Sequence, residues 1–461
     1  MIQQGETISA IATATGAGGI GIIRLSGEKA LEVAAKIFRS KSGKSITAAK
    51  SYQAMYGSLV KENGELIDEA ICLVMKSPHS YTMEDVVELQ CHGGAMPLKE
   101  TLELTYRYGA RPAERGEFTK RAFLNGRLDL SQAQAVMDVI EAKTSDSLRL
   151  AAGHLSGAFS AKMSAVRHEI LGMIAHLEAA IDFPEDDIDD ASLADVAAQV
   201  KVLREDLQKM LATAQTGRIL REGLMTAIIG KPNVGKSSLL NALLREQRAI
   251  VTDIPGTTRD SIEEYANIGG VPLRIIDTAG IRSTEDIVEK MGVEKAVAYV
   301  KQAELVLALF DASRELTAED ERIIQLIGAS EAIILLNKTD LAVKITKEMM
   351  EEKLPGKTIL DISAARQQGL EELAEVIAKK VYGNALREEA PSFVNDARQA
   401  EILRRTDEHL AEAEKTISYG MSPDFVVIDL RAAWEKLGEI TGETVGEDII
   451  DEIFSRFCIG K

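Results

Sequence analysis

Cysteine, tryptophan and long apolar runs are all scarce in this sequence. Its three cysteines, Cys72, Cys91 and Cys458, form no CxxC pair, which argues against a disulfide scaffold and a zinc ribbon. No apolar run approaches the ~18 residues that a membrane-spanning helix needs. The opening MIQQGETISA lacks the basic and apolar regions of a signal peptide and the arginines of a transit peptide. We therefore expect a cytoplasmic protein without membrane contact.

Positive charge is also in short supply. The chain has 54 lysines and arginines against 72 aspartates and glutamates, a net charge of −18. Nucleic-acid binders usually present a basic surface, so composition alone counts against strong nucleic-acid binding by this chain. A length of 461 residues exceeds one ordinary core and predicts about two to four domains.

The chain changes character several times along its length. Residues 1–120 predict a mixed α/β domain, with short β-branched runs such as GIGIIRL and EAICLVM around a helical EKALEVAAKIF. Residues 121–217 are rich in Ala, Leu, Glu and Lys and predict amphipathic helices. Helical character returns over 382–461, which predicts one helical domain built from both segments. We interpret the acidic DFPEDDIDD (182–190) as a solvated turn rather than a metal site.

Residues 218–381 predict a doubly wound, Ras-like domain. Apolar strands alternate there with helices, which is typical of a parallel sheet covered on both faces. GKPNVGKSS places Gly235, Lys236 and Ser237 between an apolar strand and a helix, the setting of a phosphate-binding loop. Backbone N–H groups would cradle phosphates, Lys236 would reach the β and γ phosphates, and the Ser237 hydroxyl would ligate Mg²⁺.

Three further motifs in the same domain specify the nucleotide. In NKTD, Asn337 to Asp340, the carboxylate can accept from N1–H and the exocyclic amine of guanine, whereas adenine presents an acceptor there. Ser363 and Ala364 stand where backbone contacts to the guanine carbonyl are expected. Asp277 of DTAG would hold Mg²⁺ through water, and Thr258 of PGTTRD would bind Mg²⁺ directly. The remaining predicted nucleotide contacts are Val234, Ser238, Asp253, Thr278, Ala279, Gly280 and Lys338.

GAGGIG near the N-terminus imitates a dinucleotide fingerprint. Gly16, Gly18 and Gly21 match GxGxxG, but that fingerprint needs a helix opening at its third glycine. The following IIRLSG reads as a strand. We predict a turn before a strand and no dinucleotide site.

The whole chain resembles the MnmE (TrmE) family of tRNA modification GTPases. The resemblance rests on GIGIIRLSG, ELQCHGG, AFLNGRLDL, GKPNVGKSSLLNAL, DIPGTTRD, DTAGIR and the terminal FCIGK. AFLNGRLDL and FCIGK are specific to that family, whereas many GTPases share the other G motifs. The resemblance implies addition of an aminomethyl or carboxymethylaminomethyl group at C5 of the tRNA wobble uridine.

The resemblance also implies cofactors and partners. The one-carbon donor would be 5,10-methylene-tetrahydrofolate, for which 5-formyl-tetrahydrofolate is an analogue, bound by the N-terminal domain. The chain would form a homodimer through that domain. It would join the flavoprotein MnmG (GidA), which binds FAD and uses NADH, in a heterotetramer or a larger complex.

Ile281 raises a question about hydrolysis. It follows DTAG, where Ras-type proteins carry a Gln that orients the attacking water. The resemblance implies that K⁺ at a G-domain pair supplies the positive charge, with Asn233, Thr252, Ile254 and Thr257 as ligands. It also implies that Glu289 is catalytic and acts on the water through a bridging water. Asn233 can equally serve only the backbone of its loop, and Glu289 by itself would read as a solvated helix residue.

Four residues match folate contacts of the family: Arg24, Glu88, Arg127 and Lys461. Glu88 can pair bidentately with the amidine edge of a pterin, although by itself it could be an exposed strand residue. Some members have Lys at the position of Arg127, which leaves that contact open. Cys458 matches a family cysteine needed for modification, and the sequence does not decide whether it acts covalently.

A second class of function shares the same G motifs. A ribosome-assembly GTPase, or another GTP-switch binding protein, would use the flanking domains as interaction modules. Reduced-folate binding by the N-terminal domain would favour the enzyme, and ribosome co-sedimentation without folate binding would favour the switch protein.

Overall fold

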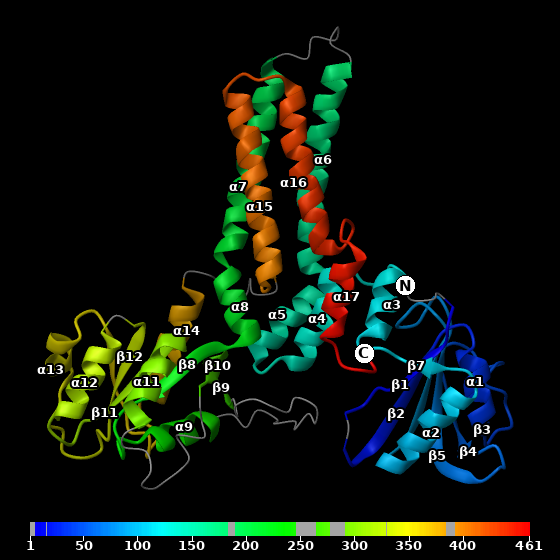
Figure 1. Ribbon diagram of the computed structural model, residues 1–461, viewed down its shortest axis with the longest axis horizontal. Coiled ribbons are helices and arrows are strands. Elements are labelled where there is room, and N and C mark those ends of the chain that lie inside the picture. The colour runs from blue at the N-terminus through cyan, green and yellow to red at the C-terminus, as the bar shows by residue number, and fades with distance from the viewer. Residues whose placement is uncertain are drawn as a thin grey trace. The chain divides into compact units, whose positions relative to one another are not determined.

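The computed structural model describes residues 5–14, 16–182, 190–245, 264–276, 291–328, 330–383 and 392–461. These residues form two compact units. The first unit joins residues 1–137 to the C-terminal 438–461, and the second contains the described residues from 138 to 437 (Figure 1).

The first unit is built on a seven-stranded sheet in the order β3-β4-β5-β6-β2-β1-β7, antiparallel except for the β1–β7 pair. Helices α1 (Ala30–Ile37) and α2 (Ala95–Arg107) cover one face and share its apolar core. The short β-branched runs predicted here are confirmed as strands, and these strands bury every second side chain. The strands are β1 (Ile8–Ile11), β2 (Gly18–Ser26), β3 (Phe38–Ser40), β4 (Gln53–Val60), β5 (Leu66–Met75), β6 (Val86–Gly93) and β7 (Arg111–Pro112).

The sheet also shows the structure of the GAGGIG segment that matches GxGxxG. Gly18 and Gly21 both lie within strand β2, so no helix opens at the third glycine. The predicted strand after this glycine-rich turn is confirmed.

The C-terminus belongs to the first unit. Helix α17 (Glu447–Ser455) packs Phe454 against the residues of α3 (Glu117–Leu124) and the start of α4 (Leu130–Glu141) in a small apolar core. The last residues then pair with the loop before α3, where the Gly116 N–H donates to the Cys458 carbonyl and the Phe118 N–H to the Lys461 carbonyl. These bonds hold the terminal residues beside the sheet.

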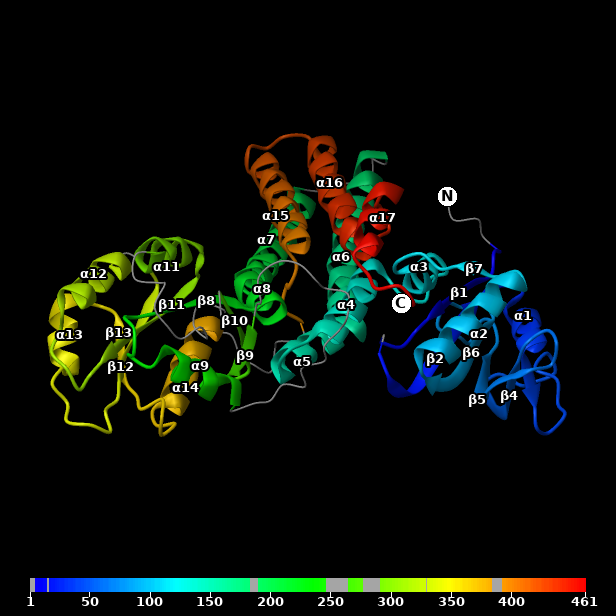
Figure 2. The same cartoon turned by 60° about the horizontal axis from the view of Figure 1, so that its bottom comes forward.

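A six-stranded sheet in the order β13-β12-β11-β8-β10-β9 forms one part of the second unit. Its central strands β11 (Leu305–Asp311) and β12 (Ala332–Asn337) are buried at every position, as expected for parallel strands covered on both faces. The other strands are β8 (Leu224–Ile229), β9 (Glu264–Ile268), β10 (Val271–Ile275) and β13 (Thr358–Asp361), surrounded by α9 (Lys236–Arg245), α11 (Met291–Gln302), α12 (Ala318–Ile327), α13 (Lys347–Lys353) and α14 (Leu370–Tyr382) (Figure 2).

Strand β9 was not predicted. It pairs antiparallel with β10 through a two-residue turn at Gly269 and Gly270, both of which have positive φ. A Gly-Gly pair is the usual chemistry of such a tight hairpin, so the signal was present in the sequence. The predicted doubly wound, Ras-like sheet is confirmed, with this one antiparallel edge added.

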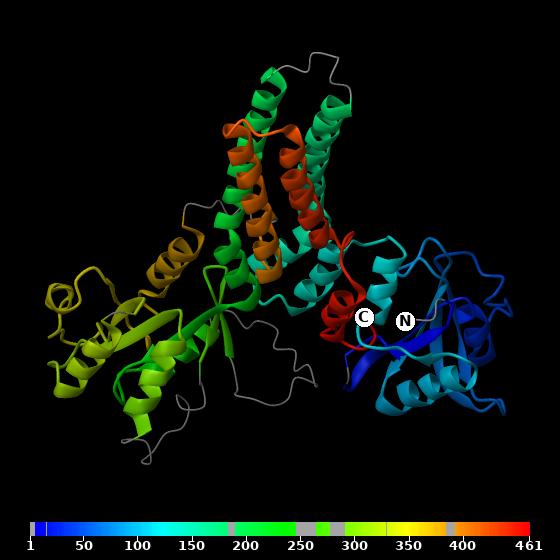
Figure 3. The same ribbon diagram turned by 45° about the horizontal axis from the view of Figure 1, so that its top comes forward.

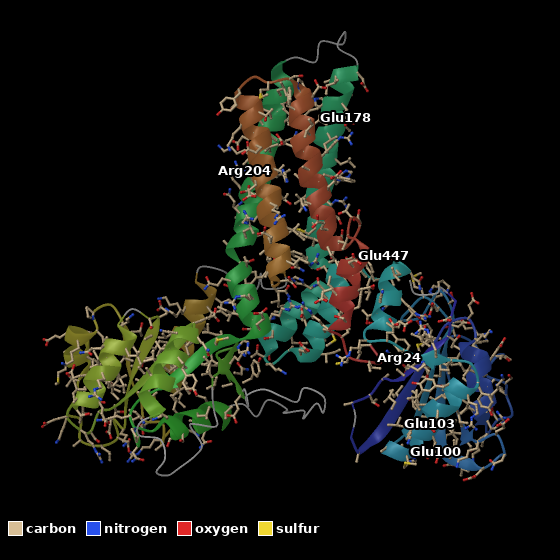
Figure 4. All side chains as sticks on the ribbon, viewed as in Figure 1. Arg24, Glu100, Glu103, Glu178, Arg204 and Glu447 are labelled. Carbon is tan, nitrogen blue, oxygen red and sulfur yellow. The ribbon has the colours of Figure 1, made fainter. Side chains whose placement is uncertain are left out.

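Four long helices lie side by side in the second unit: α6 (Ala158–Asp182), α7 (Asp190–Ala212), α15 (Ala397–Ser418) and α16 (Pro423–Thr441) (Figure 3). Arg204 of α7, labelled in Figure 4, pairs with Asp407 and Glu414 of α15. Helices from before and after the nucleotide-binding region therefore pack together. Among the described residues, no helix is long and apolar enough to cross a bilayer.

A mostly buried ionic cluster joins helices α8 (Ala214–Glu222), α4 and α15. Arg221 of α8 pairs with Asp138 at 2.8 Å and with Asp396, the N-cap of α15, at 2.8 Å. Nearby, the Tyr382 hydroxyl of α14 donates to Asp146 of α5 (Ser145–Leu155) at 2.6 Å. These contacts join the end of the nucleotide-binding sheet region to the helical region by polar bonds within one unit.

Candidate functional site

The GKPNVGKSS loop lies between β8 and α9, the setting predicted for a phosphate-binding loop. Gly230, Asn233 and Gly235 all have positive φ, at 154°, 61° and 107°. A Cβ added to Gly235 would lie 2.1 Å from Nδ2 of Asn337. Glycine is therefore required there both by the backbone conformation and by the close approach of the neighbouring motif.

Lys236 caps this loop. Its Nζ donates to the carbonyl oxygens of Gly230 at 2.7 Å and Lys231 at 2.9 Å, and burial lowers its pKa. Both partners are neutral, so the ammonium keeps its charge available for an anion at the loop. A phosphate is the ligand that such a loop and helix N-terminus favour.

Asn337 connects three parts of the site. Its Nδ2 donates to the Val234 carbonyl at 2.7 Å, and its Oδ1 accepts from the Ala364 N–H at 3.0 Å. The side chain is nearly fully buried. The phosphate loop, the NKTD motif and the Ser363–Ala364 loop are therefore held together by one amide, although they lie far apart in the chain.

Asp340 is positioned by its neighbours. Its carboxylate accepts from the Ser363 hydroxyl at 2.8 Å and faces the Arg366 guanidinium at 3.3 Å. The Ser363 hydroxyl, with help from Arg366 and Lys338, holds the pKa of Asp340 below its usual range. The side chain is thus an ionised acceptor with a fixed direction, as pairing with the guanine N1–H and amine requires.

Two supporting acids were missed by the sequence analysis. Asp311, at the end of β11, accepts from Lys338 Nζ at 2.7 Å, and the same Nζ donates to the Asn233 carbonyl at 2.8 Å. Asp320, in the capping box of α12, accepts from Lys231 Nζ at 2.6 Å. A polar residue closing an apolar strand, and a T-x-x-D before a helix, were the available signals.

Several predicted residues lie outside the described part of the chain. The switch I residues, DTAG, the Ile281 position and the catalytic candidate Glu289 all belong to this group. The full set is Thr252, Asp253, Ile254, Thr257, Thr258, Asp277, Thr278, Ala279, Gly280, Ile281 and Glu289. Of the predicted K⁺ ligands, only Asn233 is described.

A second candidate site lies in the first unit. Arg24 of β2 stands directly opposite Glu88 of β6 in the sheet register. Arg24 donates to Oε1 of Glu88 through Nε at 3.0 Å and lies 2.9 Å from it through a terminal nitrogen. Both side chains are mostly buried, with 17% and 12% of their surface exposed. Glu88 is therefore not the exposed strand residue that sequence alone allowed.

The ring of Tyr81 lies close to both Arg24 and a second predicted folate residue, Arg127. The guanidinium carbons of Arg24 and Arg127 lie 5.6 Å and 4.8 Å from the centre of its ring, within cation–π range. Burial, together with the nearby Arg24, lowers the pKa of Lys461. Arg127 and Lys461 therefore lie near the Arg24–Glu88 pair, so the four predicted folate residues form one cluster. Tyr81 belongs to the same cluster and was not predicted from the sequence.

The three cysteines have different surroundings. Burial raises the pKa of Cys72 to about 12 and that of Cys91 to about 11. Cys458 is exposed. Its neighbour Arg456 pairs with Glu452, whereas Lys461 lies close enough to interact with the thiol electrostatically. The two buried thiols suit packing roles, and Cys458 remains the accessible one.

Comparisons with known proteins agree across the chain. Residues 130–458 match the MnmE helical domain family, and residues 7–127 match the GTP-binding protein TrmE N-terminus family. The chain is 51% identical to the tRNA modification GTPase MnmE of Alkaliphilus oremlandii (strain OhILAs) over 457 residues, 99% of each chain. It is 49% identical to the protein of that name from Clostridioides difficile (strain 630), again over 99% of each chain. The chain belongs to the MnmE family of tRNA modification GTPases.

Proposed function

We propose that the chain is a K⁺-activated, Mg²⁺-dependent GTPase that modifies C5 of the wobble uridine of certain tRNAs. It adds an aminomethyl or carboxymethylaminomethyl group from methylene-tetrahydrofolate, together with the FAD protein MnmG (GidA). The observation that carries the proposal is the Arg24–Glu88 pair with Tyr81, Arg127 and Lys461 around it. A simple GTP switch has no use for such a site in addition to its nucleotide site.

The donor set suits a reduced folate. A pterin offers an amidine edge to the Glu88 carboxylate, and its glutamate tail offers carboxylates to Arg127 and Lys461. The planar ring has an aromatic neighbour in Tyr81. Folate bound here would supply the one-carbon unit, while the exposed thiol of Cys458 is the chain's own candidate for the chemical step.

Glu88→Gln is expected to weaken binding of 5-formyl-tetrahydrofolate by about 100-fold or more, because it removes charge-assisted hydrogen bonds worth ~1.5–3 kcal/mol each. Isothermal titration of the full chain measures the loss. Glu103→Gln, at an exposed position on α2 of the same unit, is the matched control and should bind normally. Equal affinity in both variants would remove Glu88 from the folate site and shift the proposal towards a GTP-switch protein.

Each residue of the proposed nucleotide site has a separate role. Lys236 and the loop N–H groups would bind phosphates, Ser237 and Thr258 would hold Mg²⁺, and Asp340 would recognise guanine. K⁺ would supply positive charge beside the phosphates as the transition state develops. Asn233 fits a ligand role because its side chain is exposed and, among the described residues, accepts and donates no hydrogen bond. Glu289 would then orient the water, which explains an Ile at 281.

The steady-state GTPase rate is expected to fall about tenfold or more when KCl is replaced by NaCl at equal ionic strength. This is a modest expectation, since an arginine finger in the same position contributes far more than about tenfold. Asn233→Ala should reduce the rate in KCl while leaving GTP affinity in NaCl unchanged. Equal rates in the two salts would rule out the ion and direct the search to an arginine supplied by another chain.

Dimer formation has a suitable surface in the first unit. One row of side chains crosses four neighbouring strands of the sheet and consists of Tyr56, Ile71, Gln90 and Ile22. Tyr56 and Ile71 are 53% and 44% exposed, on the sheet face away from α1 and α2. The Arg24–Glu88 row lies two residues along the same face. A homodimer through this face would cover apolar surface and border the folate site.

A further inference from the structure

An unusually basic segment stands out in this acidic chain. Residues 33–61 contain six lysines or arginines and no aspartate or glutamate, although the net charge of the chain is −18. The segment runs from the middle of α1 through the edge strand β3 and the loop after it to the end of β4 (Figure 1). Its charges therefore collect at one edge of the sheet.

Most of these charges lack a carboxylate partner within the described part of the protein. Lys41 pairs with Glu69, and Lys61 with Glu65 and Glu100. Arg39 instead donates to the carbonyls of its own chain neighbours. Among the same described residues, the side-chain ammonium groups of Lys44 and Lys50 have no hydrogen-bond or ion-pair partner. Unpaired ammonium groups in a chain with an excess of acids leave a local positive potential.

Lys44 and Lys50 border one open hollow of about 650 Å³. Small and apolar residues, Ala48, Ala49 and Met55, line it between them. Lys76 brings a third ammonium, since its Nζ donates to the Thr47 carbonyl at 3.2 Å. None of the described residues that line the hollow is acidic.

An aromatic ring completes the hollow. Tyr52 lines it and is 64% exposed. Its φ of 60° is unusual for a residue other than glycine, and the conformation is held by a 2.6 Å hydrogen bond from its N–H to the Val74 carbonyl. A strained backbone that displays a large ring to solvent needs a reason beyond packing.

We infer that this basic edge, defined as Lys44, Lys50, Lys76 and Tyr52, binds the tRNA. The inference rests on the proposed function. Ammonium groups bind phosphates without reading sequence, and an exposed tyrosine stacks on an unpaired base. The edge lies on the β3–β4 side of the sheet, whereas the Arg24–Glu88 pair of the folate site belongs to β2 and β6. It also explains how a chain with a net charge of −18 can engage RNA.

The test compares two double variants of the full chain with equal changes in charge. Lys44→Glu with Lys50→Glu alters the basic edge. Lys301→Glu with Lys379→Glu alters two exposed lysines of the nucleotide-binding region. Affinity for a substrate tRNA is measured by anisotropy over a range of KCl concentrations. Tyr52→Ala is measured in the same way.

The basic-edge variant should bind tRNA about tenfold or more weakly than the control variant, and its slope of log K against log salt should shrink by about 1.5, since two phosphate contacts are lost. Tyr52→Ala should weaken binding several-fold and leave the slope unchanged. GTPase rate and 5-formyl-tetrahydrofolate binding should be unaltered in all three, which establishes that each is folded.

Equal affinity and slope in both double variants would overturn the inference. So would normal tRNA binding combined with weakened capture of the partner flavoprotein, because the edge would then be a protein-docking surface. Neither result concerns the proposed function, which is tested separately by asking whether the wild-type chain and its partner modify the wobble uridine.

Discussion

Asp340→Asn should weaken GTP binding by roughly 10²–10⁴-fold, because a site built to pair with a polar edge strongly rejects a mismatch there. In the proposed site the carboxylate would accept two charge-assisted hydrogen bonds from guanine, and bonds of this kind are among the strong ones. The amide that replaces it would point an N–H₂ group at a donor edge of the base. Ser363 and Arg366 hold the side chain in place, so it cannot turn away to relieve the mismatch.

The same variant should gain affinity for XTP. Xanthine carries a carbonyl where guanine carries its amine, and the introduced amide can donate to that oxygen. Nucleotide affinity, measured with fluorescent GTP and XTP, gives both numbers. Asp361→Asn is the control, because Asp361 closes the neighbouring strand β13 but pairs only with Lys347 among the described residues. GTP affinity equal to the wild type in Asp340→Asn would refute base reading by this residue.

Arg221→Met is expected to be strongly destabilising. Arg221 is the shared partner of Asp138 and Asp396, whose side chains are 9% and 15% exposed. Removing one partner of a buried ion pair typically costs ~3–5 kcal/mol, because a buried charge remains unpaired. The midpoint of thermal unfolding should fall by roughly 10 °C. Arg404→Met, which removes two exposed pairs within one helix, should barely move the midpoint, since water already screens such pairs.

The stability lost in Arg221→Met should become smaller as pH falls. Burial raises the pKa of Asp138 even with Arg221 present. Burial also acts to raise the pKa of Asp396, but Arg221 and the Arg398 N–H outweigh it and hold the pKa low. Without Arg221, both pKa values should exceed their unfolded values. The folded variant would then bind more protons than its unfolded chain, so its stability should rise as pH falls.

Calorimetry of the wild type and the variant between about pH 5 and 8 measures this dependence. The gap between their midpoints should narrow towards the acidic end, and adding Asp138→Asn to Arg221→Met should recover part of the loss. A gap that is constant over this range, or that widens as pH falls, would contradict a cost that arises from unpaired carboxylates.

Local patterns in the sequence were enough to predict most strands of the sheet in the nucleotide-binding region. Buried parallel strands read as continuous apolar runs, so β8, β11 and β12 could be located directly. Strand β9 was missed because it lies at the edge and has mixed polarity. Its Gly269–Gly270 turn is a short-range signal that the strand–helix alternation obscured.

The motifs predicted which nucleotide binds, but only the fold showed which neighbouring residues hold the motif side chains in place. GKPNVGKSS and NKTD name the residues expected to face GTP because their chemistry is set by type and spacing. Asn337 bridging Val234 and Ala364 could not be foreseen, because it joins segments that only the sheet brings together. The anchoring of Lys338 by Asp311 has the same origin.

The sequence by itself determined the family and the fold class, and it supplied the residues predicted to contact nucleotide and folate, since each is encoded in contiguous motifs. Only the tertiary structure decided what surrounds them. It brought Glu88 into a mostly buried pair with Arg24, placed Tyr81 within cation–π range of two guanidinium groups, and paired Arg221 with two mostly buried acids. Burial, orientation and charge pairing depend on neighbours that are distant in the chain, and no local pattern specifies those neighbours.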